Sequence, residues 1–282
     1  MARERGTRVS GDRRDDRYAA MFERLSARGE GAFVPFTVLG DPDPETGGAV
    51  LEALVEGGAD ALELGIPFSD PVADGPAIQA AAGRALAALV RPADCLVLVR
   101  EVRTRHPDLP IGLLVYANLV ERMGQDRFCE EAARAGVDSV LVADVPELES
   151  APFRAAAVRA GVQSIGLVPP NVSEAVLAAV VSRSAGYVYV VSRPGVTGAD
   201  RGQHDAARAV IERLRRVGAP PALMGFGIAE PHQVRSALEM GAAGAISGSA
   251  VAERIGLHED RAALAAELTA FVREMKAATG AA

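Results

Sequence analysis

Three carboxylates lie close together in one stretch of the sequence, ALELGIPFSDPVADGP, which spans residues 61–76. Glu63 stands in an apolar run typical of a buried strand, whereas Asp70 and Asp74 follow in a loop-like segment. A carboxyl group in apolar surroundings has a raised pKa, and such a group can exchange protons near neutral pH. The pattern therefore indicates acid–base chemistry. For Glu63, a buried acid that only accepts backbone hydrogen bonds is the structural alternative.

The sequence lacks a lysine, a histidine cluster or a nucleotide-binding motif at the positions where covalent, metal or cofactor chemistry would need them. The only lysine, Lys276, lies in the last predicted helix, which excludes Schiff-base chemistry. The four histidines lack metal-ligand spacing, so we expect no metal site. No GxGxxG motif follows a predicted strand, so a nicotinamide cofactor has no support. Carboxylate acid–base catalysis without a cofactor remains.

Composition bounds the class of protein. The 282 residues, of which 49% are hydrophobic, are enough for one α/β barrel domain. A net charge of −7 without a basic block argues against nucleic acid as a partner. The sequence has no apolar run long enough for a membrane span and no signal-peptide pattern at its start. With two cysteines, we expect a soluble cytoplasmic protein. Residues 1–16 are predicted to be a disordered tail before a single domain at 17–282.

Eight short apolar runs alternate with Ala-rich helical patterns, after an amphipathic helix at 18–28. The predicted strands are 32–39, 60–65, 111–116, 139–144, 164–168, 187–192, 222–227 and 244–248. The predicted helices are 45–57, 76–104 in two pieces, 119–135, 147–160, 173–183, 204–217, 231–240 and 260–277. Strands that are apolar throughout fit a parallel sheet covered by helices. Eight such units predict a single-domain (β/α)8 TIM barrel with an extra N-terminal helix. A doubly wound open sheet is the alternative.

A barrel places its active site at the C-terminal ends of the strands. There, the GFG motif at 225–227 and the SGS motif at 247–249 end the last two predicted strands. Barrels commonly bind a phosphate at this position, and Ser249 could begin a short helix whose N–H groups face the anion. The polar, Gly-rich segment 193–206 is predicted to be a mobile lid, with a long surface loop as the alternative.

Long segments of the chain resemble the α subunit of tryptophan synthase. The resemblance runs from about Arg17 to Lys276. Its segments are GAFVPF, LELGIPFSDPVADGP, PIGLLVYANLV, VDSVLVADVP, SRPGVTG, GFGI and GAAGAISGSA. It implies cofactor-independent retro-aldol cleavage of indole-3-glycerol phosphate to indole and glyceraldehyde 3-phosphate, in L-tryptophan biosynthesis. It also implies that indole passes to a β subunit, which carries pyridoxal phosphate, within an α2β2 heterotetramer.

The resemblance assigns roles to individual residues. Glu63 matches the acid–base catalyst, Asp74 matches the carboxylate that binds the indole N–H, and Tyr189 matches a tyrosine beside the glutamate. The residues that match substrate-binding positions are Phe36, Tyr116, Thr197, Gly198, Phe226, Gly227, Gly248 and Ser249, with Leu141, Ala143 and Ile165 as further walls of an indole slot. Asp70, Pro71 and Asn118 match the surface that meets the β subunit.

Three alternatives stay open on the sequence. One is a free-standing indole-3-glycerol phosphate lyase without a β partner. Another is a non-catalytic regulatory barrel, against which the retained pair Glu63 and Asp74 argues. The third is a different phosphosugar barrel, which a lysine or histidine at a strand end would have favoured.

Overall fold

Apolar, β-branched runs form a parallel sheet that closes on itself. The structure, a computed structural model, describes residues 16–191, 201–225, 227–258 and 260–280, with 201–204 described by their backbone only. Within these ranges the strands are β1 (Ala32–Val38), β2 (Leu62–Gly65), β3 (Ile111–Val115), β4 (Ser139–Val142), β5 (Gln163–Ser164), β6 (Gly166–Val168), β7 (Val188–Val191), β8 (Ala222–Gly225) and β9 (Gly244–Ser247). They are hydrogen-bonded in the order β5-β4-β3-β2-β1-β9-β8-β7-β6.

The strand predicted at 164–168 is divided into β5 and β6. β5 pairs with β4, and β6 pairs with β7. Between them, the N–H of Ile165 donates to the carbonyl of Val140 at 3.1 Å. Because the two halves of this strand bond to different neighbours, β5 and β6 together take the place of one strand. The described strands therefore occupy the eight positions of a barrel. The predicted TIM barrel is confirmed, and the open sheet is excluded.

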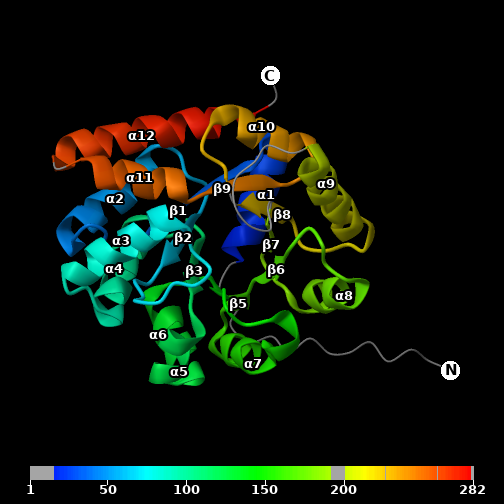
Figure 1. Cartoon of the computed structure of the whole chain (residues 1–282), viewed down its shortest axis with the longest axis horizontal. Helices are drawn as coiled ribbons and strands as arrows, with labels where there is room; N and C mark the ends of the chain where they lie inside the picture. Colours follow the sequence, from blue (N-terminus) through cyan, green and yellow to red (C-terminus); the bar gives the residue numbers. More distant parts are fainter. Residues whose placement is uncertain (1–15, 192–200, 226, 259, 281–282) are drawn as a thin grey trace.

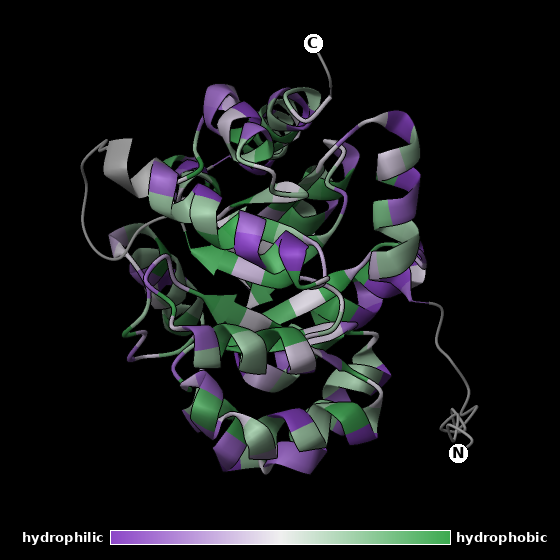
Figure 2. Cartoon of the chain, turned by 90° about the vertical axis from the view of Figure 1, so that its right-hand side faces the viewer, coloured by the Kyte–Doolittle hydropathy of each residue, from purple (hydrophilic) through white to green (hydrophobic). Residues whose placement is uncertain are grey.

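Helices surround the strands (Figure 1). They are α1 (Arg17–Arg28), α2 (Pro44–Glu56), α3 (Pro76–Ala87), α4 (Pro92–Arg105), α5 (Ala117–Met123), α6 (Gln125–Ala135), α7 (Ala151–Ala160), α8 (Glu174–Arg183), α9 (Arg201–Arg216), α10 (Pro231–Glu239), α11 (Ser249–Leu257) and α12 (Arg261–Ala277), with a 3-10 turn, η1 (Glu147–Glu149). Figure 2 shows hydrophobic strands inside and polar residues on the outer faces of the helices. No helix among the described residues is long and apolar enough to cross a membrane.

Two predicted helices are each divided in the structure. The helix predicted at 119–135 is α5 followed by α6, because Gly124 between them has a φ of 88°, which an α-helix does not allow. The helix predicted at 147–160 is η1 followed by α7. Both breaks lie on the outside of the barrel and leave the strand order unchanged.

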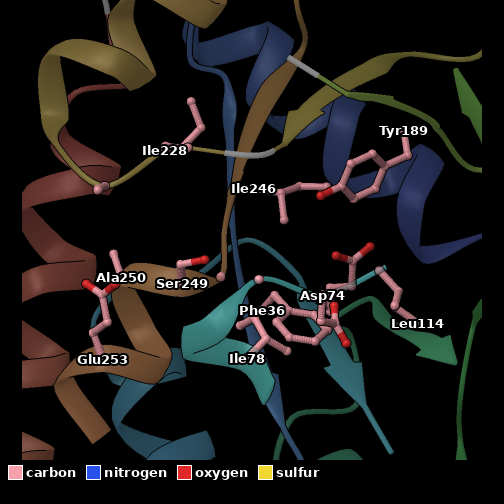
Figure 3. Close-up of a pocket in the computed structure, with 15 residues that line it drawn as sticks. Phe36, Asp74, Ile78, Leu114, Tyr189, Ile228, Ile246, Ser249, Ala250 and Glu253 are labelled. Carbon is pink, nitrogen blue, oxygen red and sulfur yellow. The ribbon is translucent and has the colours of Figure 1, made fainter. Parts of the chain in front are cut away.

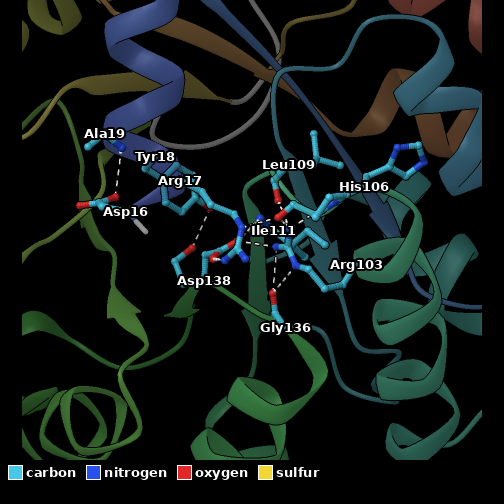
Figure 4. Close-up of polar contacts among 12 residues, drawn as sticks. Asp16, Arg17, Tyr18, Ala19, Arg103, His106, Leu109, Ile111, Gly136 and Asp138 are labelled. Carbon is cyan, nitrogen blue, oxygen red and sulfur yellow. Dashed lines mark hydrogen bonds and ion pairs between the residues drawn. The ribbon is translucent and has the colours of Figure 1, made fainter. Parts of the chain in front are cut away.

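The N-terminal helix α1 packs at the N-terminal end of the barrel. Its Tyr18 is buried and hydrogen-bonds with Ser139 of β4 at 2.9 Å. Beside this contact, Asp138 accepts hydrogen bonds from Arg17 of α1 and Arg103 of α4, each at 2.7 Å (Figure 4). Asp16 accepts a hydrogen bond from the N–H of Ala19 and caps α1. Asp16 therefore belongs to the folded domain, whereas residues 1–15 of the predicted tail lie outside the described residues.

Candidate active site

Glu63 lies within β2 and is almost completely buried, with 2% of its surface exposed. The hydroxyl of Tyr187 donates a hydrogen bond to its Oε1 at 2.8 Å. Its other oxygen, Oε2, has no hydrogen-bond partner among the described residues. Burial raises the pKa of Glu63 to about 7, because an ionised carboxyl is poorly solvated there, and the bond from Tyr187 opposes the shift. Both protonation states are therefore populated near neutral pH.

Asp74 ends the loop that precedes α3. The hydroxyl of Tyr116 donates to its Oδ2 at 2.8 Å and accepts a hydrogen bond from the N–H of Ala73 at 3.1 Å. The ring of Tyr116 stacks on Phe68, with 5.2 Å between the ring centroids. Burial raises the pKa of Asp74, and the hydrogen bond from Tyr116 opposes that shift. Tyr116, predicted as a wall of the substrate slot, does not line the cavity that Glu63 and Asp74 share, but its hydroxyl holds the second acid in place.

Both acids line one cavity of about 150 Å³ (Figure 3). Tyr189 lies with them on one side, and the start of α11 with Ser249 and Glu253 lies on the other. The structure brings together these predicted residues: Phe36, Glu63, Asp74, Tyr189, Gly227, Gly248 and Ser249. The apolar wall includes four residues that the sequence interpretation missed: Ile78, Leu114, Ile228 and Ile246. The cavity thus joins an acidic end, an apolar wall and a helix N-terminus.

The end of the cavity away from Glu63 and Asp74 is formed by the backbone at the start of α11, with the side chain of Glu253 beside it. Helix α11 begins at Ser249, as predicted, after Gly248 at the N-cap. The first N–H groups of a helix have no acceptor within the helix, and together with the helix dipole they attract an anion. A Cβ at Gly248 would lie 3.1 Å from the Phe36 ring, so a glycine suits this close approach. The arrangement fits a phosphate group.

Tyr187 is the main functional residue that the sequence interpretation overlooked. It stands at the beginning of a predicted strand, where an aromatic residue is typical of core packing. Alternate side chains of a strand point to the same face, so the side chain of Tyr187 is expected on the face that carries Tyr189, and this spacing is the signal that could have found it. Burial raises the pKa of both tyrosines well above the ordinary value, so both hydroxyls stay protonated at neutral pH.

The remaining predicted substrate-binding residues either line another cavity or lie outside the described residues. Thr197, Gly198 and Phe226 are outside the described residues, as is the part of the predicted lid at 193–200. Residues 201–206 of that predicted lid belong to α9 instead. Leu141, Ala143 and Ile165 line a neighbouring cavity of about 430 Å³, which η1, α7 and the divided fifth strand border.

The predicted partner-facing residues are at the surface. Asp70 and Asn118 are exposed, and Pro71 is half-buried. None of the three lines the cavity that holds Glu63. Between Pro71 and Asp74, the apolar side chain of Val72 is 82% exposed. These positions are separate from the reaction centre, which leaves them free for contact with another chain.

The fold and the site together define a class: an α/β-barrel enzyme with one buried and one half-buried carboxyl group and an anion-binding helix N-terminus around one cavity. A family model described as "Tryptophan synthase alpha chain" matches residues 22–280. The chain belongs to this family.

Similar proteins and solved structures support the same family assignment. The tryptophan synthase alpha chain of Vibrio cholerae is 54% identical over 265 residues, which cover 94% of this chain and 99% of the relative. That of Edwardsiella ictaluri is 56% identical and covers 93% of this chain and 98% of the relative. Among solved structures, the alpha subunit from Legionella pneumophila has a TM-score of 0.83 at 32% identity, covering 94% of this chain and 98% of that one. A tryptophan synthase complex from Pyrococcus furiosus matches with a TM-score of 0.77 at 34% identity, over 88% and 98% of the two chains.

Proposed function

We propose that this chain uses Glu63 and Asp74 as the acid–base pair that cleaves indole-3-glycerol phosphate to indole and glyceraldehyde 3-phosphate. The type of reaction follows from the family: the chain is a carbon–carbon lyase that performs the α reaction of tryptophan synthesis. One observation carries the assignment of residues. A buried glutamate with a pKa of about 7 shares its cavity with a second acid whose pKa is also raised.

The chemistry requires two proton transfers at neighbouring atoms. Glu63 in its acid form gives a proton to indole C3, which makes the ring a leaving group. The bond between C3 and the glycerol carbon then breaks, and its electron pair returns to the ring. The hydroxyl on that carbon loses its proton to the Glu63 carboxylate as the aldehyde forms. Glu63 is protonated again at the end of the reaction. A pKa near the working pH suits both the donation and the uptake of the proton.

Asp74 supports the intermediate. Protonation at C3 places positive charge on the indole ring, and the ring N–H becomes a stronger hydrogen-bond donor. An Asp74 carboxylate, which Tyr116 holds by a hydrogen bond, accepts that N–H and stabilises the charge. Since each step is a proton transfer between substrate and carboxyl groups, we propose that the α reaction needs no cofactor. Pyridoxal phosphate belongs to the β partner.

The two ends of the substrate match the two ends of the cavity. The apolar wall of Phe36, Leu114 and Ile246 suits the indole ring. The phosphate lies at the N-terminus of α11, against Gly227, Gly248 and Ser249. Thr197, Gly198 and Phe226 complete the substrate site in this proposal.

We also propose a β subunit as partner, in an α2β2 heterotetramer. Solved relatives from Pyrococcus furiosus and Mycobacterium tuberculosis are described as a tryptophan synthase complex and as tryptophan synthase. The surface positions Asp70, Pro71 and Asn118 form the contact, together with exposed Val72. The two cysteines are free and buried, which suits the reducing cytoplasm where we place the complex.

The test is indole release from indole-3-glycerol phosphate by the purified chain, alone and with a β subunit. We expect slow release that rises steeply with the partner. Asp70→Asn is the matched variant, because it should weaken the rise and leave the basal rate unchanged. Fast release that ignores the partner would show a free-standing lyase. No release in either case would contradict catalysis and support the regulatory barrel.

A further inference from the structure

Two helices present their N-termini to opposite ends of the site cavity. Asp74, Gly75 and Ile78 line the cavity at the start of α3, next to the acids. Ser249 and Ala250 line it at the start of α11, where the phosphate is proposed to bind. The distance between these two helices therefore sets the distance between the indole end and the phosphate end.

One arginine joins the two helices. Arg84, in the last turn of α3, donates from Nη2 to the carbonyl of Ala252 in α11 at 3.2 Å. The same guanidinium forms a two-pronged ion pair with Asp41, with Nε to Oδ1 at 2.7 Å and Nη2 to Oδ2 at 2.8 Å. The Asp41 side chain is fully buried and lies in the loop after β1. Arg84 thus connects β1, α3 and α11 at one point.

The surroundings hold the guanidinium in a single position. A Cβ at Gly256 of α11 would lie 2.9 Å from Nη1 of Arg84, so that α11 packs directly on the guanidinium. A bidentate arginine–carboxylate pair has fixed geometry, unlike the point charge of a lysine. Burial raises the pKa of the Asp41 carboxyl, and the hydrogen bonds and charge of Arg84 oppose that shift. The link therefore resists sliding of α3 against α11.

We infer that Arg84 is a positioning residue, which fixes the spacing between the acid end and the phosphate end of the site through Asp41 and the carbonyl of Ala252. Arg84 touches neither end of the substrate. It acts by keeping the two helix N-termini at the spacing that one molecule with both an indole and a phosphate requires. This inference rests on the proposed function, since it assigns those two groups to the two ends.

A positioning role for Arg84 predicts an effect on ligand binding that a purely stabilising role does not predict. A ligand that joins both groups gains affinity because binding of one end raises the effective concentration of the other. A change in spacing reduces this gain without weakening either half-site. Arg84→Lys keeps the positive charge beside Asp41 but loses the bidentate geometry and the bond to Ala252. Indole alone and glycerol 3-phosphate alone should therefore bind within about twofold of wild type, whereas an indolylpropyl phosphate should bind about tenfold more weakly.

The experiment measures the three dissociation constants by calorimetry for the full chain, under conditions where every variant is folded. Arg103→Lys is the matched control, because Arg103 also pairs with a largely buried aspartate, Asp138, and with backbone carbonyls, at the other end of the barrel. Asp41→Asn is a second variant, which keeps the side-chain shape and should give a smaller loss in the same direction. Steady-state kcat/KM should fall with the affinity of the joined ligand.

Two results would overturn the inference. One is an Arg84→Lys chain that binds all three ligands like the Arg103→Lys chain. The other is an equal loss for all three, which would show damaged half-sites instead of altered spacing. Failure of the proposed function itself would be separate, because the wild-type chain would then fail to bind the joined ligand or to release indole.

Discussion

Buried and half-buried acids at the two ends of the barrel are held in different ways. At the N-terminal end, Asp138 bonds to Arg17 and Arg103, and Asp60 pairs with Lys276 at 3.0 Å. At the C-terminal end, Glu63 and Asp74 form no ion pair with any described residue and accept hydrogen bonds from tyrosine hydroxyls instead.

The difference separates structural acids from acids suited to chemistry. A neighbouring cation favours the ionised form of an acid, and the ion pair fixes the elements that carry the two groups. An acid held by a neutral hydroxyl is oriented, yet it can still take up a proton. Asp41 shows that the end of the barrel alone does not determine how an acid is held, because it follows the C-terminal end of β1 and nevertheless pairs with Arg84. The partner, more than the depth of burial, indicates the role.

The largest expected effect is on stability at the N-terminal end. Asp138→Ala should lower the free energy of unfolding by about 3 kcal/mol, because it removes the carboxylate that pairs with two part-buried guanidinium groups and accepts the N–H of Ile111. The kcat of the remaining folded protein should stay within about twofold. Urea unfolding and indole release measure the two quantities. Glu130→Ala, at an exposed ion pair, is the control, and its cost should stay below about 0.5 kcal/mol.

At the C-terminal end, the effect of replacing Glu63 on the free energy of unfolding should depend on pH. Relative to wild type, the variant should gain stability as the pH rises. The folded-state pKa of Glu63, about 7, is above its ordinary value of 4.5, so the folded chain binds the proton more tightly than the unfolded chain does. Wild-type stability from this group is therefore full below pH 4.5 and is lost as the pH rises through 7. Each pKa unit is worth about 1.4 kcal/mol, so the loss is on the order of 3 kcal/mol.

Glu63→Gln removes that pH dependence. Its free energy of unfolding, relative to wild type, should rise by about 3 kcal/mol between about pH 4.5 and about pH 8.5, as measured by urea unfolding. A constant cost of burying the new amide does not affect this difference. A flat difference over that pH range would show that Glu63 has an ordinary pKa in the folded chain, and the contrast between the two ends would be lost.

A smaller effect should follow from the hydroxyl that orients Glu63. Tyr187→Phe removes the hydrogen bond to Oε1 and should reduce kcat about tenfold, since one such bond is worth about 1.4 kcal/mol. It should also raise the pKa of Glu63 further, because the bond favours the carboxylate. Tyr18→Phe is the control, since the Tyr18 hydroxyl bonds with Ser139. Equal losses in both variants would indicate general damage to the barrel interior.

The sequence predicted those features that depend on local pattern. Apolar strands, the acids in and after β2 and the helix that begins at Ser249 follow from neighbouring residues, and the structure brings the acids and that helix to one cavity. Contacts between distant elements were not predictable in this way. Tyr187 is far from Glu63 in sequence, and Arg84 is 43 residues from Asp41. The break at Ile165 also depends on pairing with two different strands.

The most direct test of the account is turnover by Glu63→Gln in complex with a β subunit. The substituted glutamine would keep the size of the side chain and an acceptor for the Tyr187 hydroxyl, but it cannot transfer protons. We expect kcat for indole release to fall by about 10³-fold or more, with the affinity for an indolylpropyl phosphate within a few-fold of wild type. A variant that retains about a tenth or more of wild-type turnover would contradict Glu63 as the acid–base catalyst.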